Sequence, residues 1–313
     1  MTDWKILLTD GLNENGQAIL RAVAEVDDRE DITAEVLLQV AEQYDAMIVR
    51  GRTKVNETVL TAAKRLKVIG RAGVGIDNIN LSVAKSMGIT VVNTPRSTSR
   101  AVAELTMSLM LSLARSVPRA DAAMKNGQWL KKQLEGIELY GKTLGIVGLG
   151  NIGSVVLQSS VGMGMKVIAY DPLLPDDEIR RRGAEPVSLP EMYAQSDFIT
   201  LHVPLTPDTK GLIGQVALNQ MKPGVRLICA ARGGIVDEEA LLEALNTGHV
   251  AGAALDVYTK EPPGQSALVG HPRVVATPHI GAQTEEAQAR TSADIATEVL
   301  AALRGEALRW RIV

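Results

Sequence analysis

Short apolar runs alternate with amphipathic helical patterns from the start of the chain to about residue 93. The runs have the length of buried strands, and the segments between them repeat apolar positions at helical spacing. Such alternation is typical of a parallel sheet whose strands are joined by crossover helices. We therefore predict a small α/β domain with strands at Ile6–Leu8, Asp45–Val49, Lys67–Ile69 and Ile89–Val92, and with helices near 17–24, 34–41, 57–63 and 81–87.

The same alternation resumes after residue 142. Its apolar runs predict the six strands of one sheet, the number expected of a dinucleotide-binding domain, at Thr143–Val147, Lys166–Tyr170, Phe198–Val203, Val225–Ala230, Gly252–Val257 and Val274–Ala276. Helical patterns lie between them at 191–194, 215–221 and 237–246. The last helical pattern, Thr284–Leu303, is long, and we expect it to return to the first domain. The first domain would then be discontinuous in sequence.

One helical pattern, Ala101–Ala114, is apolar on nearly all sides. A helix of this kind must be buried on several sides. We interpret it either as an ordinary core helix or as part of a dimer interface, and we expect Pro118 to end it. A second helical stretch leads to Trp129 and then to Lys131 and Lys132, which form either a solvated face or a contact to an anionic substrate.

A glycine motif follows the strand Thr143–Val147 and opens a helical pattern. Gly148 permits a tight turn, Gly150 lets a pyrophosphate approach the backbone, and Gly153 lets the helix pack closely on the strand. The N–H groups at the start of that helix would face the phosphates. The next predicted strand ends at Asp171, where a carboxylate would bind an adenosine ribose and repel a 2′-phosphate. The sequence therefore predicts a dinucleotide site that prefers NAD to NADP.

Two loops of the first domain have side chains suited to anions. Arg50-Gly51-Arg52 and Arg71-Ala72-Gly73-Val74-Gly75 each follow a predicted strand, at the sheet edge where ligands bind in open α/β folds. Arginines can bind an anion directly, and glycine-rich backbone can present N–H groups to a carboxylate. The other interpretation is that the arginines are solvated and the glycines only turn the chain.

Three polar residues follow strands in the second half of the chain, and each is flanked by glycine or proline. They are Arg232, Glu261 and His279. Hydride transfer from a 2-hydroxy acid needs a cation for the carboxylate, a base for the hydroxyl proton and a group that orients the base. Histidine suits the base because imidazole ordinarily titrates near neutral pH. The spacing of His202, His249, His271 and Cys229 does not suggest a metal site, and we expect none.

Composition narrows the class of protein. The 313 residues suggest two domains, and the formal charge of −3 gives no reason to expect binding to nucleic acid or to a membrane surface. Cys229 is the single cysteine, which excludes an internal disulfide and fits a reducing cytoplasm. The N-terminus lacks the apolar core of a signal peptide, and no apolar run has membrane-spanning length. We therefore expect a cytoplasmic protein.

The chain resembles the D-isomer-specific 2-hydroxyacid dehydrogenases over nearly its whole length. The likeness rests on the segments Arg71–Asn78, Gly148–Gly153, Ala231–Asp237, Ala254–Val257 with Glu261–Pro263, and Pro278–Ala282. It implies a Rossmann NAD domain at residues 98–283, inserted into a flavodoxin-like substrate domain at residues 1–97 and 284–313. Both domains would be doubly wound parallel sheets. It also implies a homodimer or a dimer of dimers.

The resemblance assigns roles to particular residues. It implies that His279 is the acid/base, that Glu261 is its partner and that Arg232 binds the substrate carboxylate together with the Val74 and Gly75 amides. Asp256 would meet the nicotinamide carboxamide. Arg50, Arg52 and Lys131 would lie on the phosphate side of the substrate, with Lys131 coming from the other subunit. The residues implied to bind NAD are Val74, Gly148, Gly150, Asn151, Ile152, Gly153, Asp171, Val203, Pro204, Ala230, Ala231, Arg232, Asp256, His279, Gly281 and Ala282.

The implied reaction is NAD-dependent oxidation of 3-phospho-D-glycerate to 3-phosphohydroxypyruvate, the entry to serine synthesis. The alternatives are an enzyme for glyoxylate, hydroxypyruvate or another unphosphorylated acid, and an NAD(H)-sensing interaction protein of the corepressor kind. The chain departs from the family pattern at Asn151, at Cys229-Ala230 and at the turn Arg96–Arg100, all of which bear on cofactor affinity. Because the sequence ends at Val313, we also expect no C-terminal regulatory domain and no serine feedback through one.

Overall fold

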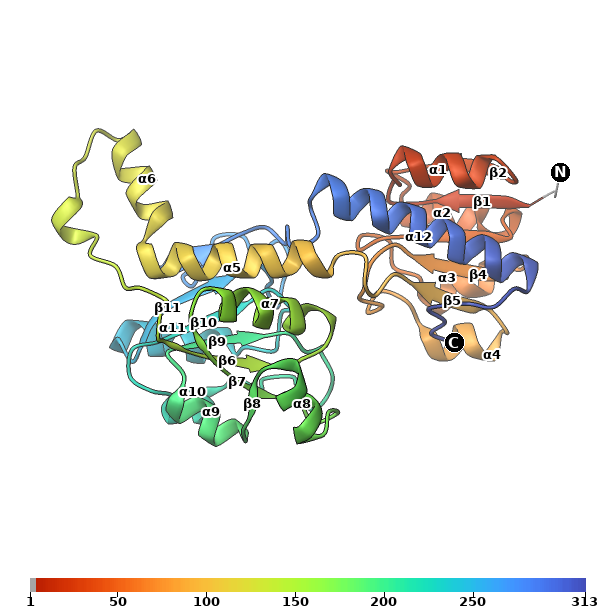
Figure 1. Cartoon of the computed structure of the whole chain (residues 1–313). Coiled ribbons are helices and arrows are strands. Elements are labelled where there is room, and N and C mark those ends of the chain that lie inside the picture. Colours follow the sequence, from red (N-terminus) through yellow and green to blue (C-terminus); the bar gives the residue numbers. More distant parts are fainter. Residues whose placement is uncertain (1–3) are drawn as a thin grey trace. The chain divides into compact units, whose positions relative to one another are not determined.

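The computed structural model describes residues 4–313, which divide into two compact units. The first takes the chain up to Thr98 and again from Ala282, and the second spans Ser99–Gly281. Each unit has its own parallel sheet, with helices on both faces (Figure 1). The predicted fold class, two doubly wound α/β domains, is confirmed.

The sheet of the first unit has the order β2-β1-β3-β4-β5, in which every pairing is parallel. This is the flavodoxin-like order. Its strands are β1 (Lys5–Leu8), β2 (Glu25–Asp28), β3 (Ala46–Val49), β4 (Val68–Arg71) and β5 (Thr90–Asn93). Its helical segments are α1 (Glu14–Arg21), α2 (Ala34–Val40), η1 (Ala41–Gln43), α3 (Glu57–Ala62), α4 (Leu81–Ser86) and α12 (Glu285–Arg304).

Side chains alternate across this sheet and so form two cores. Leu7 and Met47 face α2, α3 and α4, whereas Ile6 and Ile48 face α1 and α12. At Gly70 a Cβ would lie 2.5 Å from Val299, so glycine lets α12 pack directly on β4. Helix α12 thus belongs to the first unit.

The sheet of the second unit has the order β12-β11-β10-β9-β6-β7-β8 and is parallel throughout. Its strands are β6 (Thr143–Val147), β7 (Lys166–Tyr170), β8 (Glu185–Pro186), β9 (Phe198–Leu201), β10 (Val225–Cys229), β11 (Val250–Leu255) and β12 (Val274–Ala276). Its helical segments are α5 (Ser99–Arg115), α6 (Val117–Lys125), η2 (Lys131–Gln133), α7 (Asn151–Gly162), α8 (Asp176–Arg182), α9 (Leu189–Gln195), α10 (Gln215–Gln220) and α11 (Glu238–Thr247).

Helices cover both faces of this sheet as well. Helices α9, α10 and α11 bury apolar side chains against one face, and α5, α7 and α8 against the other. The strand order reverses at β6, which lies between β9 and β7. Such a reversal leaves a crevice at the carboxyl ends of the strands, where ligands of open α/β sheets bind.

Some elements differ from those the apolar pattern predicts. Strands β2 and β8 and helix α8 are not among the predicted elements, because none of them has the apolar pattern on which the prediction depends. Strand β2 has the sequence Glu-Val-Asp-Asp, β8 has two residues, and α8 buries only Ile179. Pro118 does not end α5. That helix ends at Arg115, Ser116 takes a left-handed conformation with φ 52°, and Pro118 lies in the first turn of α6.

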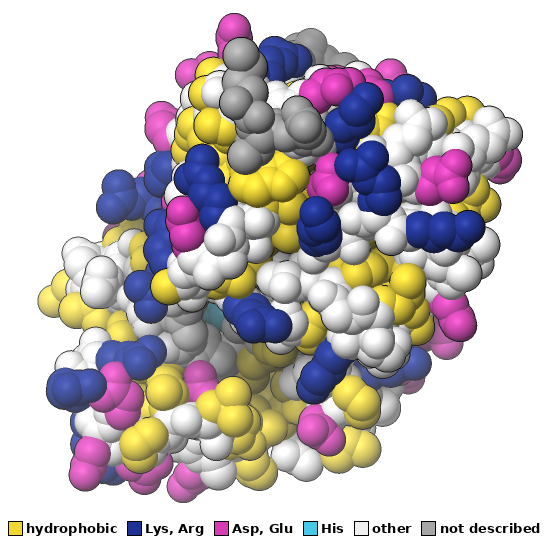
Figure 2. Space-filling model, turned by 90° about the vertical axis from the view of Figure 1, so that its right-hand side faces the viewer, with side chains coloured by type: hydrophobic (Ala, Val, Ile, Leu, Met, Phe, Trp, Pro, Cys, Tyr) yellow, Lys and Arg dark blue, Asp and Glu magenta, His cyan; other side chains and the backbone are white. Residues whose placement is uncertain are grey.

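The surface carries mixed charge. On the face shown in Figure 2, lysine and arginine side chains are interspersed with aspartate and glutamate, and hydrophobic side chains lie between them. Among residues 4–313, no helix combines the length and the apolar character that crossing a membrane requires.

Candidate active site and dinucleotide site

His279 and Glu261 form a hydrogen-bonded pair at the carboxyl edge of the second sheet. Glu261 follows β11 and His279 follows β12, two neighbouring strands. Glu261 Oε2 and His279 Nδ1 are 2.7 Å apart, and Glu261 Oε1 accepts the Tyr258 N–H at 3.0 Å. Because both carboxylate oxygens are engaged, Glu261 fixes the plane of the imidazole and leaves Nε2 as the ring nitrogen that can take or give a proton.

The turn that carries His279 is held by a buried carboxylate. Asp256 is 1% exposed, and its oxygens accept hydrogen bonds from Thr277 Oγ1, the Ile280 N–H and the Gly281 N–H at 2.6, 2.8 and 2.8 Å. His279 itself has φ 53°, a conformation that few side chains adopt without support. Asp256 therefore stabilises an unusual backbone conformation at the candidate base.

Arg232 follows β10 on a loop that packs against the loop carrying Glu261. At Gly233 a Cβ would lie 1.9 Å from the Tyr258 carbonyl oxygen, so this approach requires glycine. Arg232 Nη1 donates to the Ala231 carbonyl at 2.7 Å, and Cys229 Sγ donates to the Arg232 carbonyl at 3.7 Å. The structure thus brings the loops of Arg232, Glu261 and His279 to adjacent strand ends.

The buried Cys229 thiol gives a testable consequence. Burial raises its pKa to about 11, which leaves roughly one thiol in a thousand ionised at pH 8. We expect the native protein to react with a disulfide reagent at pH 8 at less than about 1% of the rate measured in urea, and the native rate to rise about tenfold per pH unit up to pH 10. Rapid stoichiometric labelling of the native protein at pH 8 would contradict this assignment.

The glycine loop has the backbone geometry that a dinucleotide site requires. Gly148 has φ +90°, and a Cβ there would lie 2.7 Å from the His202 carbonyl oxygen, whereas a Cβ at Gly153 would lie 2.1 Å from the Gly148 oxygen. At Gly150 a Cβ would meet nothing within 4 Å, so that side of the loop is open. Asn151 and Ile152 begin α7, whose first N–H groups lack helical acceptors. These residues fit a pyrophosphate.

Asp171 lies beside this loop at the end of β7. Its Oδ2 accepts the Leu149 N–H at 2.8 Å and its Oδ1 accepts the Leu173 N–H at 2.9 Å. It borders a cavity of about 450 Å³ whose walls come from the end of β7, α8 and the segment after β8. The other residues of this unit that the resemblance implies for NAD also follow strands of the sheet. Val203 and Pro204 follow β9, Ala230 and Ala231 follow β10, Asp256 follows β11, and Gly281 follows β12.

In the first unit, the Gly73–Gly75 loop presents backbone N–H groups. The Gly73 carbonyl accepts the Thr94 N–H at 3.0 Å, and the Val74 carbonyl accepts Asn93 Nδ2 at 2.8 Å. In a trans peptide the N–H points away from the carbonyl. The N–H groups of Val74 and Gly75 therefore point away from these contacts, and among residues 4–313 neither has an acceptor.

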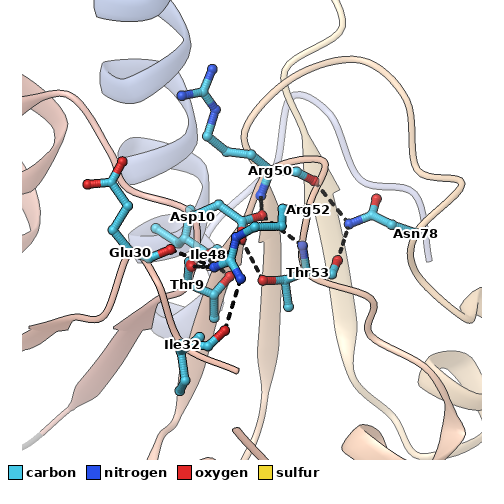
Figure 3. A network of polar contacts seen from close by, with 9 residues as sticks. All are labelled: Thr9, Asp10, Glu30, Ile32, Ile48, Arg50, Arg52, Thr53 and Asn78. Atoms are coloured by element: carbon cyan, nitrogen blue, oxygen red, sulfur yellow. Dashed lines mark hydrogen bonds and ion pairs between the residues drawn. The ribbon is translucent and has the colours of Figure 1, made fainter. Parts of the chain in front are cut away.

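Arg50 and Arg52 have different surroundings (Figure 3). The Arg52 guanidinium donates to the carbonyls of Thr9, Glu30 and Ile32 and pairs with Asp10 at 3.1 Å. Asp10 also accepts the Arg50 N–H at 2.7 Å. The Arg50 side chain is directed away from this network, so the guanidinium of Arg52 is bound within the network and that of Arg50 is not.

Lys131 and Ala282 are the two other residues that the resemblance implies for the site. Lys131 is exposed in η2, and Ala282 begins the part of the first unit that contains α12. Residues that the apolar pattern did not single out are Asp10, which organises the Arg50 loop, and Arg182 of α8, which reaches the glycine loop. The polar run Asp176–Arg182 could have signalled a helix through its acidic start and basic end.

Comparison with known proteins identifies the family of this chain. Residues 107–281 match the model of the D-isomer specific 2-hydroxyacid dehydrogenase, NAD binding domain. A D-3-phosphoglycerate dehydrogenase from Methanocaldococcus jannaschii is 47% identical over 303 residues, which are 96% of this chain and 58% of that protein. The chain spans about half the length of the curated relatives it matches.

The chain spans nearly the whole length of similar proteins whose structures are solved. A glyoxylate reductase from Paecilomyes thermophila has a TM-score of 0.91 at 31% identity and covers 100% of this chain and 99% of its own. A D-lactate dehydrogenase from Aquifex aeolicus, complexed with NAD and lactic acid, has a TM-score of 0.84 at 30% identity and covers 96% of each chain. This chain therefore belongs to the D-isomer specific 2-hydroxyacid dehydrogenases, and its second unit contains their NAD binding domain.

Proposed function

We propose that this protein oxidises 3-phospho-D-glycerate to 3-phosphohydroxypyruvate with NAD, the first step of serine synthesis, and catalyses the reverse reduction. The observation that carries the proposal is the His279–Glu261 pair, in which Nδ1 is bound to a carboxylate 2.7 Å away and Nε2 remains for the substrate. Bound NAD supplies the acceptor for the hydride from C2. Similarity to D-3-phosphoglycerate dehydrogenases supports the choice of substrate.

Each residue has a proposed part in this reaction. His279 removes the C2 hydroxyl proton, and Glu261 stabilises the imidazolium that forms. Arg232 binds the substrate carboxylate, and the Val74 and Gly75 N–H groups assist it. The loop of Gly148, Gly150 and Gly153 and the side chain of Asp171 hold the cofactor, and Asp256 supports the His279 turn. We propose the first unit, near residues 1–97 and 284–313, as the substrate domain.

For the substrate phosphate we propose Arg50 and a partner subunit's Lys131, with Arg52 shaping the Arg50 loop. The support is that the Arg52 guanidinium already has acceptors within the chain, whereas the Arg50 side chain points away from these acceptors (Figure 3). The same observation favours a second candidate, an enzyme for unphosphorylated acids such as glyoxylate or hydroxypyruvate, because it leaves only one arginine of this loop with its guanidinium outside the network.

We also propose that the protein is a cytoplasmic homodimer, alone or in a dimer of dimers. Helix α6 and the segment after it extend away from the second sheet (Figure 1), and they carry exposed apolar side chains at Val117, Met124 and Trp129, the last 75% exposed. Exposed apolar side chains that gather into a patch are a mark of protein–protein interfaces. Light scattering that gives the mass of one chain would contradict this.

Substrate choice is tested by following NADH absorbance with phosphohydroxypyruvate, hydroxypyruvate and glyoxylate at equal concentrations. We expect kcat/KM to be at least about tenfold higher for the phosphorylated acid, because one added ion pair to arginine contributes at least that factor. A preference for an unphosphorylated acid would select the second candidate. NADH binding without turnover of any of these acids would contradict both.

A further inference from the structure

The peptide between Leu149 and Gly150 is held on one side by helix α8. The Leu149 carbonyl accepts hydrogen bonds from Arg182 Nη1 at 2.6 Å and from Ser154 Oγ at 3.1 Å. The Leu149 N–H, at the other end of the same residue, donates to Asp171. The central residue of the Gly148-Leu149-Gly150 turn is thus fixed by side chains on both its carbonyl and its N–H.

This clamp determines where the next N–H points. In a trans peptide the Gly150 N–H is directed opposite to the Leu149 carbonyl, and therefore away from Arg182. Within residues 4–313 the Gly150 N–H has no acceptor, and the space beside Gly150 is open. Because glycine allows either peptide orientation, an unclamped carbonyl could rotate toward the phosphates and repel them.

Arg182 is itself fixed. Its Nε donates to Glu178 Oε1 at 2.7 Å, one turn earlier on α8, and its side chain is 32% exposed. The hydrogen bond from Arg182 lowers the pKa of Glu178, so this carboxylate is ionised at neutral pH. The neighbouring Arg181 pairs with the other oxygen of Glu178, is 77% exposed and makes no hydrogen bond with the glycine loop.

We propose that Arg182 is a positioning residue for the cofactor: held by Glu178, it clamps the Leu149 carbonyl so that the Gly150 N–H faces the pyrophosphate. The proposal rests on the dinucleotide site of the proposed function but not on the identity of the hydroxy acid. It gives helix α8, which the apolar pattern does not predict, a direct part in cofactor affinity.

The test compares Arg182→Met and Arg182→Lys with the control Arg181→Met. The control removes a guanidinium that lies on the same helix and pairs with the same carboxylate, Glu178. NADH and ADP-ribose binding are measured by fluorescence titration and by calorimetry, and melting temperature reports on folding. We expect Arg182→Met to weaken both ligands by about tenfold or more, Arg182→Lys to recover part of the loss, and Arg181→Met to bind within about twofold of the unchanged protein.

Equal affinities for NADH in Arg182→Met and Arg181→Met would overturn the proposal. If Arg182→Met does not fold, the NADH affinities of Arg182→Lys and Arg181→Lys are compared instead, because lysine retains the charge and the aliphatic stem. Equal affinities of these two variants would likewise overturn the proposal. Absence of NADH binding by the unchanged protein would overturn both this inference and the proposed function. Binding with the expected pattern but without turnover would count against the proposed function alone.

Discussion

Replacing His279 with asparagine is expected to lower kcat/KM for oxidation of 3-phospho-D-glycerate by about 10³-fold, because the substitution removes the group that takes the hydroxyl proton. Asparagine is the appropriate replacement. The residue at this position has φ 53°, and asparagine tolerates that conformation better than most side chains. The loss should fall mainly on kcat, since His279 acts on the reacting hydroxyl rather than on the remote phosphate.

Two controls separate this loss from damage to the fold. His271→Asn changes a histidine whose Nδ1 only accepts the Arg273 N–H, and it should leave kcat within about twofold. The NADH dissociation constant of His279→Asn should stay near that of the unchanged protein, because the glycine loop and Asp171 are untouched. A His279→Asn variant with normal kcat would remove His279 from the proposed mechanism.

Replacing Glu261 with glutamine should lower kcat by about 10²-fold to 10³-fold while changing KM much less. The Tyr258 N–H requires an oxygen acceptor, so the glutamine oxygen is expected to take that place. The glutamine NH₂ group then faces His279 Nδ1, which must accept instead of donate. The imidazole proton moves to Nε2, the nitrogen that should receive the substrate proton.

Glu238→Gln is the matched control for this substitution. Glu238 Oε1 accepts the Thr259 N–H at 2.6 Å, so it stabilises the same loop without touching His279. Steady-state kinetics in both directions and NADH titration should show near-normal values for Glu238→Gln. If Glu261→Gln and Glu238→Gln have the same kcat, Glu261 supports the loop and does not set the state of the imidazole.

The sequence predicts the architecture well where burial determines the pattern. Strands such as Phe198–Leu201, which is buried along its whole length, follow directly from apolar runs. Strand β2 and helix α8 do not, because charged side chains dominate both and the contacts that stabilise them come from neighbouring elements. Arg182 was missed for this reason. Its contact with Leu149 joins residues from different elements, and no local pattern encodes it.

In the candidate site, too, some features can be predicted from the sequence and others cannot. Placing chemically suitable residues after predicted parallel strands is enough to single out His279 and Glu261, since parallel strands end at one edge of the sheet. The direction of a side chain cannot be predicted in this way. Arg50 and Arg52 are two residues apart and look equivalent in sequence, yet the Arg52 guanidinium binds carbonyls of distant loops and the Arg50 side chain points away from them. Only the packed structure distinguishes them.

Hydride transfer to NAD can be followed through the hydrogen at C2 of the hydroxy acid. The protein is incubated with NAD and 3-phospho-D-glycerate deuterated at C2, and the NADH is analysed by mass spectrometry and NMR. We expect deuterium to appear at C4 of the nicotinamide and His279→Asn to slow its appearance by about 10³-fold. NADH that forms without deuterium, or deuterium transfer that is as fast in His279→Asn, would contradict this mechanism.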